Sequence, residues 1–192
     1  MVEWTDVEFR IPTVLPERGE HLAELTTQIR EQTGQPVWAS PQPEGRKPND
    51  RVRRIWSKPV DGKWMMHMND DMCLASSFGE VVPRVLEETD RKVVSFCDLR
   101  DKGHGLKTMD KPFYCDGCVA VRADIVPGFV DFYYNWIEDS EHTCAADIAF
   151  GDYTTSLGEP IDVYRPSQAQ HKQIPSTFDG RSSQRQSPTF EG

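Results

Sequence analysis

The residues best suited to chemistry follow a short hydrophobic run in the first half of the chain. The run Trp64–Met68 is apolar apart from one histidine, and it leads directly into Asn69, Asp70 and Asp71. Two adjacent carboxylates repel each other unless a positive charge neutralises them. A hard divalent cation such as Mg²⁺ or Mn²⁺ does this, with oxygen ligands and substrate phosphates around it. The acidic pair therefore indicates a metal site, although aspartates are also common in turns and at helix starts.

Two further residues could take part in such a site. His171 comes shortly after an expected strand over residues 161–164. Its imidazole could complete a metal shell that begins with Asp71. Asp147 lies in a small, apolar stretch, where a partly buried carboxylate could take the proton from an acceptor hydroxyl. A surface histidine and a capping aspartate are the alternative interpretations of these two positions.

Other kinds of site find less support in the sequence. Cys115 and Cys118 form one C-x-x-C pair, but a structural zinc ion needs a complete set of ligands. Only Cys97, Cys144 or a histidine could complete that set, at no regular spacing. We therefore expect Cys118 to be a small hydrophobic residue in a strand. The phosphate-binding motif G-x-x-x-x-G-K-[ST], the dinucleotide-binding motif G-x-G-x-x-G and the hydrolase motif G-x-S-x-G do not occur.

Length and charge limit the classes of protein to consider. The chain has 192 residues, the usual size of one domain. Its formal net charge of -9 argues against broad, nonspecific binding to nucleic acid, which depends on lysine and arginine. A local basic groove is still compatible with two arginine clusters, one at residues 51, 53 and 54 and the other at residues 181 and 185.

The sequence indicates a cytoplasmic protein with reduced thiols. It contains no apolar run of about 18 residues, so we expect no membrane span. The first six residues are acidic and do not resemble a signal peptide. Five cysteines, an odd number at irregular spacing, do not suggest a disulfide framework.

Hydrophobic periodicity predicts strands and helices in alternation along the chain. Strands are expected over residues 7–11, 36–39, 64–68, 93–97, 117–121 and 161–164, and helices over residues 20–32, 78–88 and 124–137. Residues 40–49 and 99–113 are expected to be loops, and Pro83 is expected in the first turn of its helix. This order favours an α/β fold with a mostly parallel central sheet flanked by helices. Ligands of such sheets bind beyond the carboxyl ends of the strands, which is where the acidic pair falls.

Several short motifs follow one another along most of the chain: IPTVLPER at residues 11–18, NDRVRRIW at 49–56, HMNDD at 67–71, GCVAVR at 117–122, the pair Ala-Asp at 146–147 and the histidine at 171. In this order they resemble the GT-A glycosyltransferases, and most of all small glycosyltransferase-like proteins carried by bacteriophages. The resemblance covers about residues 8–188. It implies a single GT-A (Rossmann-like) domain over residues 1–171 and a flexible C-terminal lid or tail over residues 172–192.

The resemblance also implies a donor site for a nucleotide sugar, most simply a UDP-sugar. The first strand and its loop hold the base and ribose in that family, which assigns Pro12, Thr13 and Arg18 to the donor. The segment at 49–56 adds Arg51 and Arg54, whose charge would help to seat the nucleotide. The lid over the diphosphate would contribute Arg181 and Arg185.

The metal and catalytic residues come from the remaining motifs. Residues 67–71 look like a D-x-D-type motif with Asn69 in place of the first acid. Asp71 then becomes the Mn²⁺ or Mg²⁺ ligand together with His171, and Asp70 lies nearer the ribose or sugar. Asp147 corresponds to the second acid of a pair that supplies the base in inverting members.

These assignments predict a metal-dependent glycosyltransferase, a hexosyl- or pentosyltransferase that is more plausibly inverting than retaining. The acceptor hydroxyl is open: a hypermodified base in phage DNA, a protein, a glycan or a small molecule would all fit the resemblance. One alternative is a nucleotidyltransferase, although residues 12–18 lack the glycine-rich, basic loop that a triphosphate requires. The other is a non-catalytic binding module, which the replacements at Asn69 and Ala146 would favour.

Overall fold

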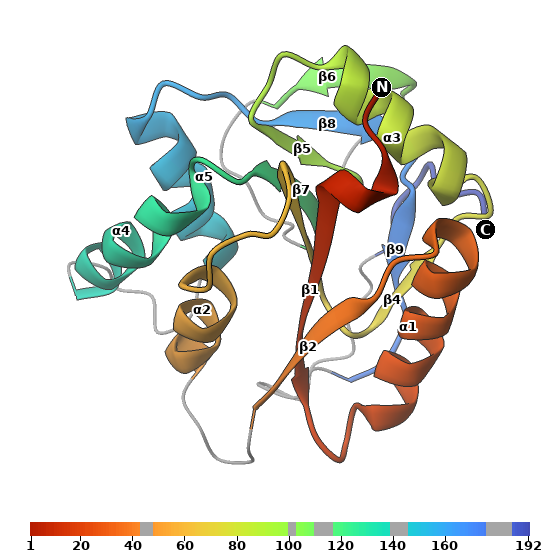
Figure 1. The fold of residues 1–192 in the computed structure, drawn as a ribbon, viewed down its shortest axis with the longest axis horizontal. Helices are drawn as coiled ribbons and strands as arrows, with labels where there is room; N and C mark the ends of the chain where they lie inside the picture. Colours follow the sequence, from red (N-terminus) through yellow and green to blue (C-terminus); the bar gives the residue numbers. More distant parts are fainter. Residues whose placement is uncertain (43–47, 100–102, 110–116, 139–145, 176–185) are drawn as a thin grey trace.

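The computed structural model describes residues 1–42, 48–99, 103–109, 117–138, 146–175 and 186–192. Their centre is a seven-stranded sheet in the order β2-β1-β3-β7-β5-β8-β6 (Figure 1). Five strands run in one direction, and β7 and β6 run in the other. The strands are β1 (Val7–Val14), β2 (Val37–Gln42), β3 (Trp64–Met68), β5 (Val93–Ser95), β6 (Gly105–Thr108), β7 (Cys118–Arg122) and β8 (Asp162–Arg165).

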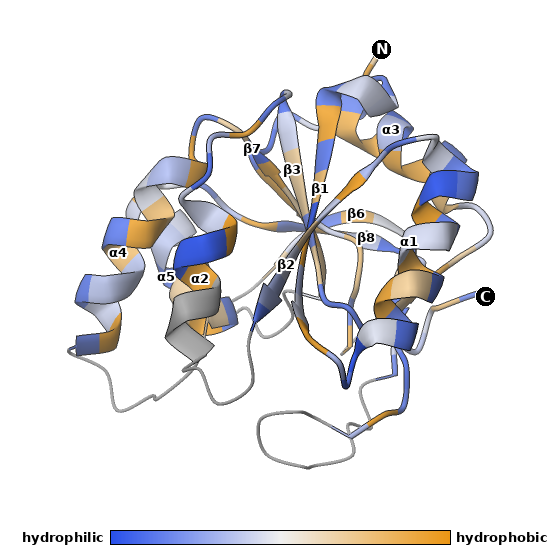
Figure 2. Cartoon of the chain, turned by 60° about the horizontal axis from the view of Figure 1, so that its bottom comes forward, coloured by the Kyte–Doolittle hydropathy of each residue, from blue (hydrophilic) through white to orange (hydrophobic). Residues whose placement is uncertain are grey.

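Helices cover both faces of this sheet, so the mostly parallel α/β fold expected from the sequence is confirmed. Figure 1 shows α1 (Gly19–Thr33) and α3 (Phe78–Glu88) on one side, and α2 (Pro48–Trp56), α4 (Val126–Glu138) and α5 (Ala146–Ser156) on the other. Each helix carries both hydrophobic and hydrophilic residues, as a helix with one face on a core requires (Figure 2). No helix in the part of the chain that the structure describes is long and apolar enough to span a membrane.

The side chains of β3 show how the sheet divides the core. Alternate residues of a strand point to opposite faces. Trp64, Met66 and Met68 belong to the hydrophobic cluster beneath α1 and α3, whereas Met65 belongs to the cluster beneath α2, α4 and α5. All four are fully buried. A strand with both faces buried is therefore a continuous apolar run rather than an alternating one.

A second, two-stranded sheet lies beside α1. It pairs β4 (Met72–Leu74) with β9 (Ala169–His171) in antiparallel register. Because β4 begins only a few residues after β3, the small sheet draws the segment after β8 towards the end of β3.

Several local expectations were wrong. Residues 105–108 form the exposed edge strand β6 inside a segment expected to be a loop. The helices α2 and α5 were not anticipated. Pro83 lies in the second turn of α3 rather than the first, and it offers no N–H to the Gly79 carbonyl. The indole Nε1–H of Trp4 donates to that carbonyl instead, at 3.1 Å.

Candidate functional site

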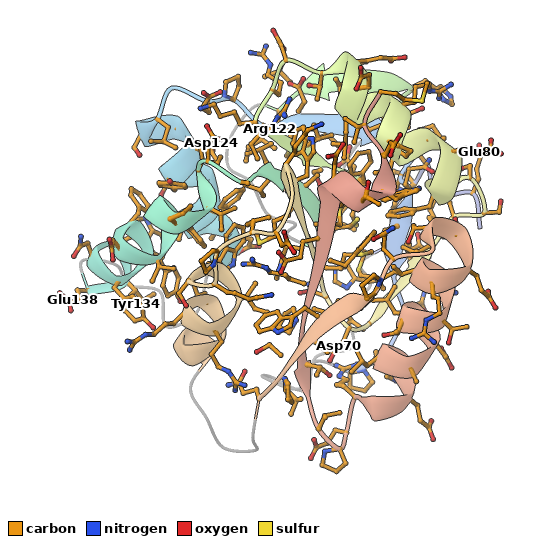
Figure 3. The ribbon with its side chains drawn as sticks, viewed as in Figure 1. Asp70, Glu80, Arg122, Asp124, Tyr134 and Glu138 are labelled. Carbon is orange, nitrogen blue, oxygen red and sulfur yellow. The ribbon has the colours of Figure 1, made fainter. Side chains whose placement is uncertain are left out.

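The turn after β3 carries the acidic residues to the edge of the sheet. The Asn69 N–H donates to the Gly117 carbonyl at 3.0 Å, and the Met72 N–H donates back to the Asn69 carbonyl at 3.3 Å. The chain therefore reverses between β3 and β4, with Asp70 and Asp71 in the turn. Figure 3 shows Asp70 at the edge where β1 and β2 end. This is the carboxyl edge, where ligands of such sheets bind.

Asp71 and His171 lie in direct contact although they are 100 positions apart in the sequence. The Asp71 Oδ1 and His171 Nδ1 atoms are 3.1 Å apart. The small sheet produces this contact because Met72, the neighbour of Asp71, pairs with His171. The Lys172 N–H also donates to the Asp71 carbonyl at 2.7 Å, so the backbone is joined on both sides of the pair.

Positive groups around Asp71 keep its carboxylate ionised. Burial alone would raise the pKa of the Asp71 carboxyl, since it disfavours the charged form. The hydrogen bond from His171 and the positive charges of His171 and Arg18 outweigh burial and hold the pKa below its ordinary value. The site therefore presents an anion at neutral pH, as a metal ligand requires.

Arg18 is a buried arginine whose side chain has a single hydrogen-bond acceptor among the described residues. It is only 6% exposed and immediately precedes α1. Its Nη2–H donates to the Pro175 carbonyl at 2.6 Å, the one hydrogen bond that its side chain makes with described residues. A guanidinium carries five N–H donors, so several of them are available to a ligand at this edge.

The shape of the site depends on the absence of a side chain at Gly117. A Cβ atom at this position would lie 2.8 Å from His171 Nε2 and 3.1 Å from Met72 Sδ. The sequence pattern places this glycine in a strand and gives no sign of its contact with His171. Its backbone angle φ is not positive, so the position needs a glycine for space and not for a turn. A sequence pattern for turns therefore does not identify it.

The geometry of Asp71 and His171 fits a small divalent ion. Neighbouring ligands of an octahedral ion with bonds near 2.1 Å lie about 3 Å apart. The 3.1 Å between Oδ1 and Nδ1 matches this separation. Among the residues that the structure describes, no group of three or more histidine, cysteine, aspartate or glutamate side chains could hold a metal. Among the described residues, Asp71 and His171 are thus the two candidate ligands of an ion here, and substrate and water could complete its shell.

Thr13 has a buried hydroxyl that lacks a partner among the described residues. The residue is 3% exposed near the end of β1, and its Oγ1 makes no hydrogen bond with the described part of the chain. Such an atom costs free energy in the unbound protein. Pro12 is buried beside it and pairs with Ser40 of β2.

The structure does not connect all of the other predicted donor residues to this pair. Arg54 is partly exposed on α2, without a described contact to Asp71. Arg51 lies in the same helix, but its side chain is not described, and Arg181 and Arg185 lie outside the described residues.

Asp147 lies in the first turn of α5, in the helical layer opposite α1 and α3. Its Oδ1 accepts a hydrogen bond from the Ile148 N–H at 2.9 Å. The N-terminus of a helix stabilises a carboxylate as an anion, which is the form that a base needs. No described contact joins Asp147 to Asp71 or His171.

The zinc alternative gains no support from the described cysteines. Cys118 is fully buried in β7, with its Sγ 3.8 Å from Met66 Sδ, as expected for a hydrophobic residue. Cys97 is also buried, and Cys115 and Cys144 lie outside the described residues.

Another buried arginine, Arg10, has a structural role. Its side chain donates to the carbonyls of Ile55, Lys58 and Pro59 at 2.7–2.8 Å, and it also pairs with Glu8. These carbonyls lie at and beyond the end of α2, where helices leave acceptors unsatisfied. Arg10 thus anchors α2 to the sheet.

Comparison with known proteins supports the assignment of the fold. No protein family model and no curated protein sequence matches the chain. One similar solved structure is a glycosyltransferase involved in the glycosylation of the major capsid of PBCV-1, with a TM-score of 0.57 and 11% sequence identity. The similarity covers 83% of this chain and 82% of that one. The chain therefore has a fold like that of the GT-A glycosyltransferases, as its motifs predict.

Two further structures are less similar. They are S. aureus TarS 1-349, with a TM-score of 0.48, and the nucleoside-diphosphate-sugar pyrophosphorylase from Vibrio cholerae RC9, with 0.47. Each is 11% identical and covers 85% of this chain, against 59% and 75% of the other chains. TM-scores this low do not establish a shared fold, so these two likenesses support no conclusion about this chain.

Gly117→Ala tests how tightly the glycine confines His171. The added methyl group must displace the imidazole or Met72, and we expect unfolding in urea to show a loss of about 1–3 kcal/mol. In a His171→Ala background the closest of these contacts is absent and only Met72 remains, so the cost of the methyl group should fall. Gly103→Ala is the control, because a Cβ there meets Arg165 at an ordinary 3.5 Å. Equal costs in the two backgrounds would contradict the described contact.

Thr13→Val tests the unpartnered hydroxyl. Valine has the same shape and no polar atom, so we expect the free energy of unfolding to rise by about 1 kcal/mol. The matched control is Thr33→Val, which removes a hydroxyl that donates to the Ile29 carbonyl at 2.7 Å. That change should lower stability by a similar amount. A loss of stability at both positions would show that Thr13 has a partner in the free protein.

Proposed function

We propose that this chain is a glycosyltransferase that uses a nucleotide-sugar donor with Mn²⁺ or Mg²⁺. The observation that carries the proposal is the contact between Asp71 and His171 at the carboxyl edge of β3, in a GT-A-like fold. A carboxylate and an imidazole at this spacing suit a divalent ion, and they lie where such sheets bind ligands.

The residues around the pair have the charge and polarity that a nucleoside diphosphate needs. Arg18 adds a buried positive charge that acts on Asp71, and its remaining N–H donors suit phosphate oxygens. The Thr13 hydroxyl offers a hydrogen bond to the base or ribose, which would satisfy it on binding. In this proposal Asp70, Asn69 and Pro12 complete the donor site, with Asp70 towards the ribose or sugar.

The reaction in this proposal transfers the sugar to an acceptor hydroxyl, with inversion. Asp147 takes the proton from the acceptor as the bond to the sugar carbon forms, and the nucleoside diphosphate leaves. When bound, the metal ion supplies positive charge to the leaving diphosphate. Arg18 stabilises the same charge from the protein side. The donor most in keeping with the motifs is a UDP-sugar.

Calorimetry with UDP-, GDP-, CMP- and dTDP-sugars tests the donor site. We expect one nucleotide class to bind in the presence of Mn²⁺ and to lose affinity in EDTA. Asp71→Ala should abolish this metal dependence, because the carboxylate of the two candidate ligands among the described residues is lost. Asp90→Ala is the matched control, since the Asp90 side chain is 93% exposed. If no donor binds to the unaltered protein, the enzyme proposal fails and a binding module without donor turnover becomes the better interpretation.

Asp147→Asn separates binding from catalysis. The amide keeps the size of the side chain and still accepts a hydrogen bond, but it cannot take a proton. We expect turnover of the bound donor, followed as release of nucleoside diphosphate, to fall by about 10²-fold or more while donor affinity stays the same. Undiminished turnover would exclude Asp147 as the base.

A further inference from the structure

The last described residues of the chain return to the connection between β8 and β9. Residues 166–168 form this connection, and Ser167 and Gln168 in it are fully buried. Ser187 packs against it and is itself only 7% exposed. The segment formed by residues 186–189, here called the C-terminal clamp, therefore belongs to the packed structure.

Three hydrogen bonds attach the clamp to two described residues, Ser167 and Gln170. The Ser187 hydroxyl donates to the Ser167 hydroxyl at 2.7 Å, and the Ser187 N–H donates to Gln170 Oε1 at 3.1 Å. The Ser167 N–H in turn donates to the Thr189 hydroxyl at 3.2 Å. Gln170 belongs to β9 and directly precedes His171. The clamp thus holds the strand that presents the histidine to Asp71.

Ser167 links the clamp to the segment that follows β5 as well. The Asp98 N–H donates to the Ser167 hydroxyl at 2.9 Å. The Asp98 carboxylate forms a buried ion pair with Arg165, the last residue of β8. Buried polar groups need their partners, and removing one member leaves the others unsatisfied. Loss of the Ser187 hydroxyl should therefore disturb the packing at the start of β9 and not only the surface around residue 187.

We propose that Ser187 is a positioning residue for the metal site, which it supports by fixing β9 and thereby His171. The part of the proposal that concerns metal affinity rests on the proposed function. The part that concerns the position of β9 does not, because it follows from the hydrogen bonds between the clamp and Gln170 and Ser167. A purely stabilising role would lower global stability without affecting β9 or metal affinity selectively.

Ser187→Ala removes the hydroxyl bond to Ser167 and keeps the backbone N–H bond to Gln170. It tests the proposal with two measurements on the full chain. Amide hydrogen exchange should be about tenfold faster in β9 and its partner β4, with little change in β1 and β3. Mn²⁺ affinity, measured by electron paramagnetic resonance of the free ion, should fall about tenfold, the lower end of the loss for direct outer partners of metal ligands, because Ser187 acts on His171 through β9. Gln186→Ala is the matched control, because Gln186 is the exposed neighbour. It should change neither measurement.

A pair of variants at Thr189 keeps the test decisive if Ser187→Ala does not fold. Thr189→Val removes the acceptor of the Ser167 N–H, whereas Thr189→Ser retains it. We expect faster exchange in β9 and weaker Mn²⁺ binding for valine only. If amide hydrogen exchange in β9 is unchanged in both Ser187→Ala and Thr189→Val, the proposal that the clamp holds β9 is wrong. If the unaltered protein does not bind Mn²⁺, the metal proposal fails, and hydrogen exchange still decides whether the clamp holds β9.

Discussion

The contact between Asp71 and His171 is the interaction on which the arrangement of the site depends. A partly buried carboxylate is costly unless a positive or donating group faces it, and here the imidazole of His171 and the guanidinium of Arg18 do so. The contact needs β3 to end before Asn69, β9 to pair with β4, and Gly117 to leave room for the ring. Each requirement involves a different part of the chain, so the site forms only in the complete fold.

Two buried arginines illustrate how burial can serve either structure or binding. The guanidinium of Arg10 is surrounded by three backbone carbonyls and Glu8, so its hydrogen-bonding capacity is used within the fold. The guanidinium of Arg18 has a single carbonyl partner among the described residues and acts on Asp71 through its charge. Because a buried cation with spare donors is costly, Arg18 gains from an anionic ligand. The two residues look alike in the sequence and differ only in their surroundings.

The sequence predicted the elements that have a strong periodic pattern. The helix over residues 78–88 and the buried strand over residues 64–68 have the bounds expected from their apolar positions. The helix α5 gave no such signal because its buried residues do not form one stripe. The strands β4 and β9 have three residues each and exist only through their pairing, which no local pattern can reveal.

The candidate site was predictable only in part. The acidic pair and His171 could be named from their residue types and from the resemblance, but their separation depends on the register of the small sheet. The roles of Gly117 and Ser187 could not be predicted from the sequence, because neither residue type indicates a functional site by itself. Gly117 matters for the side chain that it lacks, and Ser187 for a partner distant in the sequence.

The proposed metal site would also place a physical condition on the donor. A divalent ion held by Asp71 and His171, the two candidate ligands among the described residues, would leave coordination positions for phosphate oxygens and water. The ion and the diphosphate would therefore strengthen each other's binding. Before binding, Asp71 and His171 satisfy one another by their hydrogen bond, so the site keeps its shape. The protein carries a net charge of -9, yet a diphosphate bound as proposed would face Arg18 and the ion. Local charge at the carboxyl edge, rather than the charge of the whole chain, thus decides which ligands the site accepts.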